Sequence, residues 1–144
     1  MASLIPLSVK QAIVAKWIDS SEVWYLMLMK ASFVPSAAHV NLSDVVPATN
    51  EITDDKAVYP AGGVPITGRV ATVSGNNCYL AATNVQVGPG ADLSFNYGVI
   101  YTKSTGSNAA SWQIRAEIDF GGAQVVTNGT SIIQWNALGI ILVS

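Results

Sequence analysis

"WQIRAEIDF", residues 112–120, alternates apolar and polar side chains without a break. Successive side chains of a β-strand point to opposite faces, so this period of two predicts an amphipathic strand with one face on a core. The face expected to be buried carries Trp112, Ile114, Ala116, Ile118 and Phe120, and the polar face carries Gln113, Arg115, Glu117 and Asp119.

Other runs of strand length lie on both sides of this stretch. "VWYLMLMKAS" (23–32) is nearly all apolar, which predicts a buried central strand, and "LSFNYGVIYTK" (93–103) alternates again. Clusters of turn-forming residues separate the runs, which predicts an all-β fold of antiparallel strands, either a β-sandwich or a barrel. The expected turns include 75–77 (GNN), 88–92 (GPGAD) and 121–124 (GGAQ).

The two ends of the chain are less regular. Apolar residues recur every four positions in "LSVKQAIVAKWID" (7–19), which favours a short helix, although its β-branched residues also suit an extended arm. "TSIIQWNALGIILVS" (130–144) reads as a bent pair of strands or one strand kinked near Gly139. We expect one domain over 1–144, with segment 1–20 docking on a neighbouring subunit.

Charge is scarce in this sequence. Only 11% of the 144 residues are charged and 50% are hydrophobic, against roughly 25% charged in an average domain. No apolar run approaches the roughly 20 residues of a membrane-spanning helix, and seven scattered basic residues give no footprint for nucleic acid. We therefore expect the apolar surface to be covered by copies of the chain or by a protein partner, not by a membrane.

The only histidine, His39, lies in "SAAHVNLSDVV" (36–46) between Ser36 and Ser43, with Asp44 nearby. A hydroxyl, an imidazole and a carboxylate are the parts of a hydrolase site, but proximity in sequence does not assemble them. No G-x-S-x-G elbow accompanies them. The stronger interpretation is an ordered loop in which His39, Ser43 and Asp44 satisfy backbone groups, while Leu42 and Val45 anchor the loop.

No other pattern predicts catalysis, a metal site or a cofactor. One histidine and one cysteine cannot fill a zinc site, and Cys78, with no charge near it in the sequence, suits a small buried core position. Gly62 and Gly63 precede no Lys-Ser/Thr pair, which excludes a phosphate-binding P-loop and favours a tight turn with positive φ.

The ordered set of motifs resembles a family of small virion structural proteins of tailed bacteriophages, over nearly the whole chain. The matching stretches are Ile18-Asp19, Leu26 to Met29, Phe33 through Val45, Gly62-Gly63 with Ile66-Thr67-Gly68, Val99-Ile100-Tyr101, Ala116 through Gly121, and Ile133 through Leu142. The resemblance implies a jelly-roll-like sandwich that acts without catalysis as a capsid cement or decoration protein on the virion. Its partners would be the major capsid protein and its own copies, as a homotrimer made in the bacterial cytoplasm.

We expect the N-terminal segment, the 33–47 loop and the adjacent glycine turn to form the interface. A different class of function remains open, namely a receptor- or carbohydrate-binding module of the tail, neck or baseplate that uses exposed aromatic rings. The interface residues expected for the cement are Trp17, Phe33, His39, Leu42, Asp44, Gly62 and Gly63.

Overall fold

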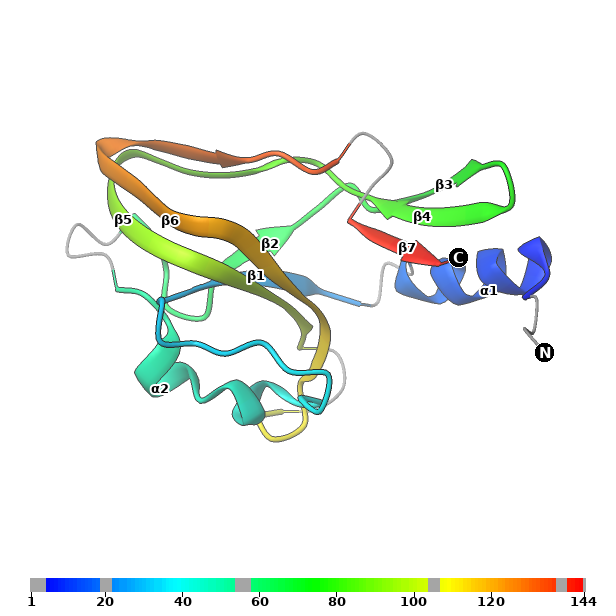
Figure 1. Cartoon of the computed structure of the whole chain (residues 1–144), viewed down its shortest axis with the longest axis horizontal. Coiled ribbons are helices and arrows are strands. Elements are labelled where there is room, and N and C mark those ends of the chain that lie inside the picture. The colour runs from blue at the N-terminus through cyan, green and yellow to red at the C-terminus, as the bar shows by residue number, and fades with distance from the viewer. Residues whose placement is uncertain (1–4, 19–21, 54–57, 104–106, 137–139, 144) are drawn as a thin grey trace.

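The computed structural model describes the chain except residues 1–4, 19–21, 54–57, 104–106, 137–139 and 144, and gives the backbone alone for 141–143. Its strands form two antiparallel sheets, with a short helix at the N-terminal end (Figure 1). The predicted all-β fold is confirmed. The jelly-roll arrangement is not confirmed, because the described strands form a four-stranded and a three-stranded sheet instead of two four-stranded ones.

The larger sheet has the strand order β2-β1-β5-β6. Its strands are β1 (Trp24–Met29), β2 (Val64–Ile66), β5 (Val85–Thr102) and β6 (Gln113–Ile133). The apolar run at 23–32 was predicted to be a buried central strand, and β1 lies between β2 and β5 as expected. All of its residues except Tyr25 are buried.

The smaller sheet has the order β3-β4-β7. It contains β3 (Val70–Ser74), β4 (Asn77–Ala81) and β7 (Ile141–Val143). The end of the chain is thus a pair of strands, one of the two expected arrangements, because β6 and β7 belong to different sheets. Helix α1 (Leu7–Trp17) confirms the helical interpretation of the N-terminal segment. It packs on β4, with Val14 fully buried and Lys10 Nζ donating to the carbonyl of Asn76 at 2.7 Å.

Strands β5 and β6 form one long hairpin that curls over the rest of the sheet (Figure 1). The turns predicted at 88–92 and 121–124 are wrong, because both stretches continue a strand. Register shifts interrupt the ladder at these places, between Val87 and Ala91 and between Phe95 and Tyr97. Gly and Pro residues mark local irregularity, and here they bend the hairpin instead of reversing the chain.

A bulge also divides the alternating stretch at 112–120. Ile100 pairs with Ala116 and Tyr101 pairs with Ile114, which leaves Arg115 as an extra residue. The expectation that all five apolar residues share one face is therefore wrong, because a bulge shifts the alternation by one residue. Trp112 and Ile114 pack against one core, whereas Ala116, Ile118 and Phe120 pack against the other.

The larger sheet separates two apolar cores. Trp24, Leu26 and Leu28 of β1 join residues of β4, β5, β6 and α1 in the first core. Met27 and Met29 point to the opposite face and join Val99 and Tyr101 of β5 in the second core. The chain between β1 and β2, which contains the 3₁₀ turn η1 (Leu42–Val45) and helix α2 (Pro47–Asn50), covers that second face (Figure 1, cyan). Both faces of β1 are thereby removed from solvent.

Candidate interaction surface

Residues 31–50, here called the covering segment, form a closed loop over the second core. The amide of Lys30 donates to the carbonyl of Asn50 at 2.8 Å, and the amide of Ile52 donates to that of Leu28 at 3.0 Å. Both ends of the segment are thus held beside the end of β1. A loop closed in this way presents one side to the sheet and the other to solvent.

Three apolar side chains anchor the covering segment. Phe33, Leu42 and Val45 are each at most 2% exposed and pack in the second core. The predicted anchoring by Leu42 and Val45 is confirmed. Phe33 and Leu42, which were expected at an interface, therefore point into their own chain. Outward-pointing neighbours in the same segment provide the surface that another molecule meets.

Backbone hydrogen bonds join the covering segment to the start of β6. The amide of Leu42 donates to the carbonyl of Trp112 at 2.8 Å, and the amide of Ile114 donates to that of Val40 at 2.9 Å. The segment thus occupies the outer edge of β6 over these residues, which would otherwise expose unpaired backbone groups.

The Asp44 carboxylate holds the turn that leads into η1. Its Oδ2 accepts from the amides of Val40 and Asn41, both at 2.9 Å. These two backbone hydrogen bonds favour the ionised form and hold the pKa of Asp44 below its ordinary value. The prediction that Asp44 satisfies backbone groups is confirmed.

His39 has a side-chain partner instead of a backbone one. Its Nδ1 lies 2.6 Å from Oε1 of Glu117 on β6, and Oε2 of the same carboxylate accepts from the amide of Ser36 at 2.7 Å. The expected bond from His39 to the backbone is therefore wrong. The sequence analysis placed Glu117 on the polar face of its strand, but the covering segment reduces its side-chain exposure to 11%.

The serines beside His39 do not complete a hydrolase triad in the described part of the chain. Ser36 Oγ accepts from the amide of Ala38 at 3.1 Å, and Asp44 serves the backbone, as described above. A carboxylate orients the imidazole, but none of the hydrogen bonds of His39 in this structure comes from a serine hydroxyl. The geometry is that of a clamp between loop and sheet.

The outer side of the covering segment carries three exposed valines that sequence reasoning missed. Val34, Val40 and Val46 are 73%, 58% and 51% exposed. Val46 also has φ +48°, a left-handed conformation that strains a β-branched residue. Each valine directly follows a residue that faces the sheet, namely Phe33, His39 or Val45. The neighbours of the predicted anchors were therefore the signal in the sequence that could have identified these exposed valines.

The glycine turn also contacts the second core. Gly62 and Gly63 have φ +90° and +91°, which confirms the predicted positive φ. A Cβ on Gly63 would lie 2.2 Å from the carbonyl oxygen of Leu26, so the turn approaches β1 closely. The Tyr101 hydroxyl donates to the carbonyl of Gly62 at 2.6 Å, which ties the turn to the second core.

A half-buried carboxylate fixes the same turn. Oε1 of Glu51 accepts from the amide of Gly62 at 2.7 Å and from the hydroxyl of Tyr59 at 2.9 Å, while Tyr59 Oη accepts from the amide of Leu28. Burial raises the pKa of Glu51, and it also raises the pKa of both tyrosine hydroxyls, Tyr59 and Tyr101. Desolvation of the Glu51 carboxylate thus costs free energy, and the two hydrogen bonds that it accepts offset this cost and hold the turn.

Aromatic rings stack beside this turn, with Tyr101 buried and Tyr25 and Trp112 half-buried. Tyr101 stacks on Tyr25 and on Trp112, with centroids 5.8 and 6.0 Å apart, and the Lys103 ammonium lies over the Tyr25 ring at 4.2 Å. Trp17 lies apart from these residues, because it packs against Trp24 at the first core. The structure therefore gathers the expected interface residues around the second core, with Trp17 as the exception.

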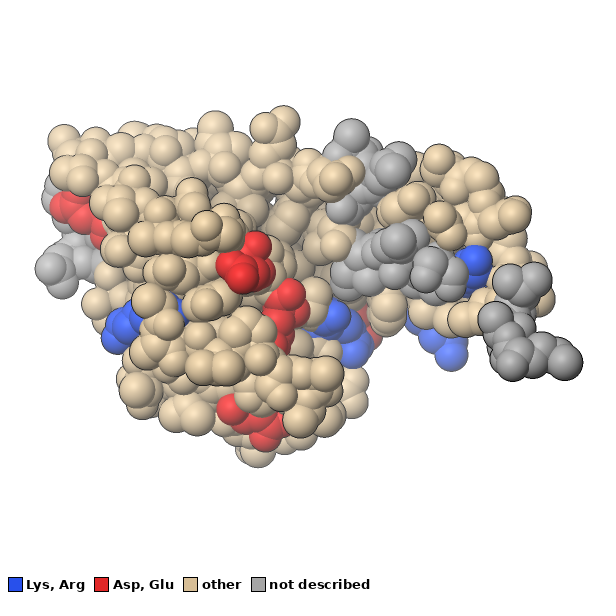
Figure 2. Space-filling view, in the orientation of Figure 1, with Lys and Arg blue, Asp and Glu red and all other residues tan. Residues whose placement is uncertain are grey.

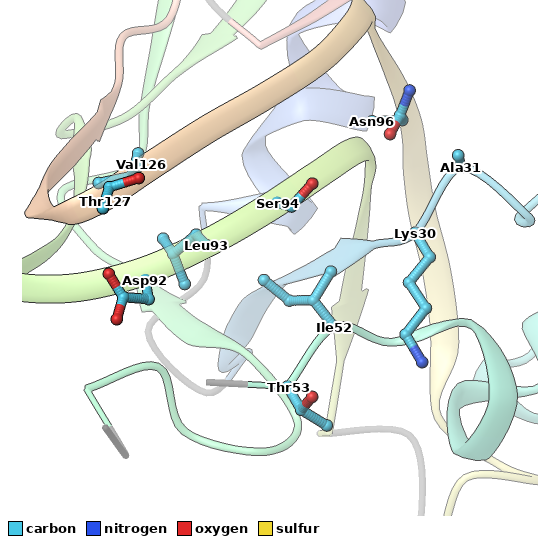
Figure 3. A pocket seen from close by; sticks show the side chains of 10 residues that line it. All are labelled: Lys30, Ala31, Ile52, Thr53, Asp92, Leu93, Ser94, Asn96, Val126 and Thr127. Atoms are coloured by element: carbon cyan, nitrogen blue, oxygen red, sulfur yellow. The ribbon is translucent and has the colours of Figure 1, made fainter. Parts of the chain in front are cut away.

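Two grooves of the described surface differ in the side chains that line them. One of about 600 Å³ has an apolar floor that includes Ile52 and Leu93, and its charged groups, Lys30 and Asp92, lie at opposite sides (Figure 3). Another, of about 420 Å³, lies beside the His39–Glu117 pair. Within the described ranges, no three His, Cys, Asp or Glu side chains are placed to hold a metal ion.

Charged groups are sparse on the face of the molecule drawn in Figure 2, where blue and red atoms cover a small part of the surface. None of the described helices has the length and apolar character that crossing a membrane requires. Comparisons with models of protein families, with curated proteins and with solved structures found no match.

Proposed function

We propose that this chain is a non-enzymatic structural subunit of a tailed-bacteriophage virion, a capsid cement protein. It forms homo-oligomers on the head surface and bridges neighbouring major capsid proteins. The observation that carries the proposal is the exposure of large apolar side chains on separate parts of a chain with few charges. They include Val34, Val40 and Val46 of the covering segment, Val70 and Val73 of β3, and Val125 and Ile132 of β6.

The distribution of these side chains supports a bridging role. An enzyme concentrates its exposed chemistry in one pocket, whereas a subunit that joins several neighbours needs contact surfaces on more than one side. Burial of apolar area contributes roughly 25 cal/mol per Å², so each contact is modest and repetition over a shell makes the total large. The family resemblance of the sequence points to the same role.

Particles assembled with and without the protein test the cement role. We expect particles that lack it to release DNA at lower temperature and after milder osmotic shock. Added purified protein should restore resistance and should appear over the whole head in an image reconstruction. Equal resistance of the two kinds of particle would contradict the proposal.

The half-buried rings of Tyr25 and Trp112, which stack on the buried Tyr101, favour a second candidate, a receptor-binding module of the tail, neck or baseplate. Aromatic rings bind sugars through their faces, but Lys103 covers part of the Tyr25 and Trp112 faces. Antibody labelling of particles separates the candidates. The antibody should label the entire head if the chain is a cement protein, and one end of the particle if it is a tail module.

A further inference from the structure

The two described sheets have four edge strands, namely β2 and β6 in the larger sheet and β3 and β7 in the smaller. The first part of β5 also lies beyond the ladder with β1, which begins at Tyr97, but it contains Pro89, Asp92 and two register shifts. An edge strand presents unpaired N–H and C=O groups that accept another strand. Natural proteins protect such edges by shortness, proline, charge, bulges or a covering loop. An edge without these devices indicates a site of pairing.

Three of the four edges are protected. β2 has three residues and its middle one is Pro65, and β7 has three residues. β6 carries Arg115, Glu117 and Asp119, its ladder with β5 has several register shifts, and the covering segment occupies its beginning. Each feature hinders addition of a further strand.

β3 has none of these protections. Its five residues, VATVS, contain no charge and no proline, and its pairing with β4 runs from Val70 opposite Ala81 to Ser74 opposite Asn77 without a shift. Val70 is 52% exposed and Val73 is 44% exposed. Because they are three positions apart, these valines lie on opposite faces of the strand, so each face carries one exposed valine at this edge.

The register also shows which backbone groups are open. Ser74 and Asn77 flank the two-residue turn at 75–76 and form the first hydrogen-bonded pair of the hairpin. Since hydrogen-bonded and non-hydrogen-bonded pairs alternate, Ala71 and Val73 turn their N–H and C=O groups away from β4. The two outward residues are therefore separated by one position, Thr72.

We propose that β3 is the site at which a second copy of this chain binds, through antiparallel pairing of the two β3 strands about a two-fold axis at Thr72. The axis places Ala71 opposite Val73 of the second copy, so that the outward groups of both strands meet in about four hydrogen bonds. Thr72 then faces its own counterpart, a favourable cross-strand pair, and no like charges oppose one another. The three-stranded sheets join into one continuous sheet.

This inference rests on the self-association in the proposed function and gives it a location and a symmetry. A two-fold pairing produces a dimer, or an even-numbered assembly of dimers, whereas the family resemblance implies a trimer. A stable dimer that fails to protect virions would remove the cement role and leave the pairing intact. If a chain that does not pair through β3 still protects virions, the pairing is contradicted and the cement role is kept.

Hydrogen exchange of the full chain tests the pairing without a mutation. At high protein concentration we expect the amides of Ala71 and Val73 to exchange at least about tenfold more slowly than in dilute protein, as they become bonded. Sedimentation should show the dimer over the same concentrations. Equal exchange of these two amides at all concentrations would overturn the inference, and so would a trimer whose β3 amides stay unprotected.

Two variants give an independent test. Val73→Lys places a charge at the paired edge and should convert the dimer to monomer, whereas Val125→Lys makes the same change at a valine 69% exposed on β6 and should leave the dimer intact. If the lysine variant fails to fold, Ala71→Pro provides the alternative test. It removes one outward N–H from each copy and should therefore weaken the dimer. A dimer that survives in folded Val73→Lys or Ala71→Pro contradicts the pairing.

Discussion

The imidazole Nδ1 of His39 lies 2.6 Å from Oε1 of Glu117, 78 positions further along the chain. This contact fastens the covering segment to β6, because the same carboxylate also accepts from the amide of Ser36. The side chains are 20% and 11% exposed, so solvent weakens the interaction only in part. A residue pair with the composition of a catalytic dyad thus serves to close a loop over a core.

A double-mutant cycle should measure this clamp. We expect His39→Ala to lower the free energy of unfolding by about 1.5–3 kcal/mol, the usual contribution of a hydrogen bond to a charged group. Glu117→Ala should cost more, because it also leaves the Ser36 amide without its acceptor. Chemical denaturation of both single variants and the double variant gives the coupling. A coupling energy near zero would show that the two side chains act independently.

The covering segment shows what a local pattern reveals and what it does not. The anchoring by Leu42 and Val45 and the role of Asp44 were predictable, because each depends on neighbours within a few residues. The partner of His39 was not predictable, since nothing near Glu117 in the sequence marks it as a residue beneath a loop. Contacts between distant segments depend on the register of β6, which several bulges shift.

The two adjacent glycines of the turn should differ in their tolerance of substitution. Gly63→Ala places a Cβ 2.2 Å from a carbonyl oxygen of β1 at a positive φ, so we expect a loss of at least about 3 kcal/mol. Gly62→Ala meets its nearest atom, the Tyr101 hydroxyl, only at 3.5 Å and should lose about 1 kcal/mol from backbone strain alone. Thermal unfolding of the two variants checks this order. Equal losses would contradict the close approach at Gly63.

Replacement of Val46 by glycine should stabilise the protein. Val46 is half exposed and has a left-handed backbone, so the substitution relieves strain and loses little packing. We expect a gain of about 1 kcal/mol, which corresponds to about 3 °C in Tm for a chain of this length. Val34→Gly is the control, because Val34 is exposed at an ordinary φ and glycine there only adds unfolded-state entropy. A fall in Tm for both variants would argue against strain at Val46.

The fold was predictable where apolar runs have one unambiguous role. β1 combines strand length with apolar side chains on both faces, which only a covered central strand accommodates. The long hairpin was not predictable in detail, since a Gly-Pro-Gly stretch is equally typical of a chain reversal and of a bulge. Residues 88–92 and 121–124 lie opposite or beside register shifts within β5 and β6, and pairing over a long distance decides between the two outcomes.

Stability should depend on pH with opposite signs at two carboxylates. Burial raises the pKa of Glu51, so the folded chain holds this proton more tightly than the unfolded chain, and the resulting stability is present in acid and lost as pH rises through the folded pKa. Glu51→Gln keeps an oxygen acceptor for the Gly62 amide and the Tyr59 hydroxyl and removes the titration. The Tm of this variant relative to the wild type should therefore rise as the pH increases from the ordinary pKa of a glutamate through the raised pKa of Glu51.

The pKa of Asp44 is lowered by two backbone hydrogen bonds, so its contribution is present above its unfolded pKa and disappears as pH falls through the folded pKa. Asp44→Asn should consequently be less stable than the wild type near neutral pH and approach it in acid, the reverse of Glu51→Gln. Thermal unfolding of the two variants across the same pH range compares the signs directly. A parallel course of both curves would mean that at least one of the two carboxylates lacks the surroundings described above.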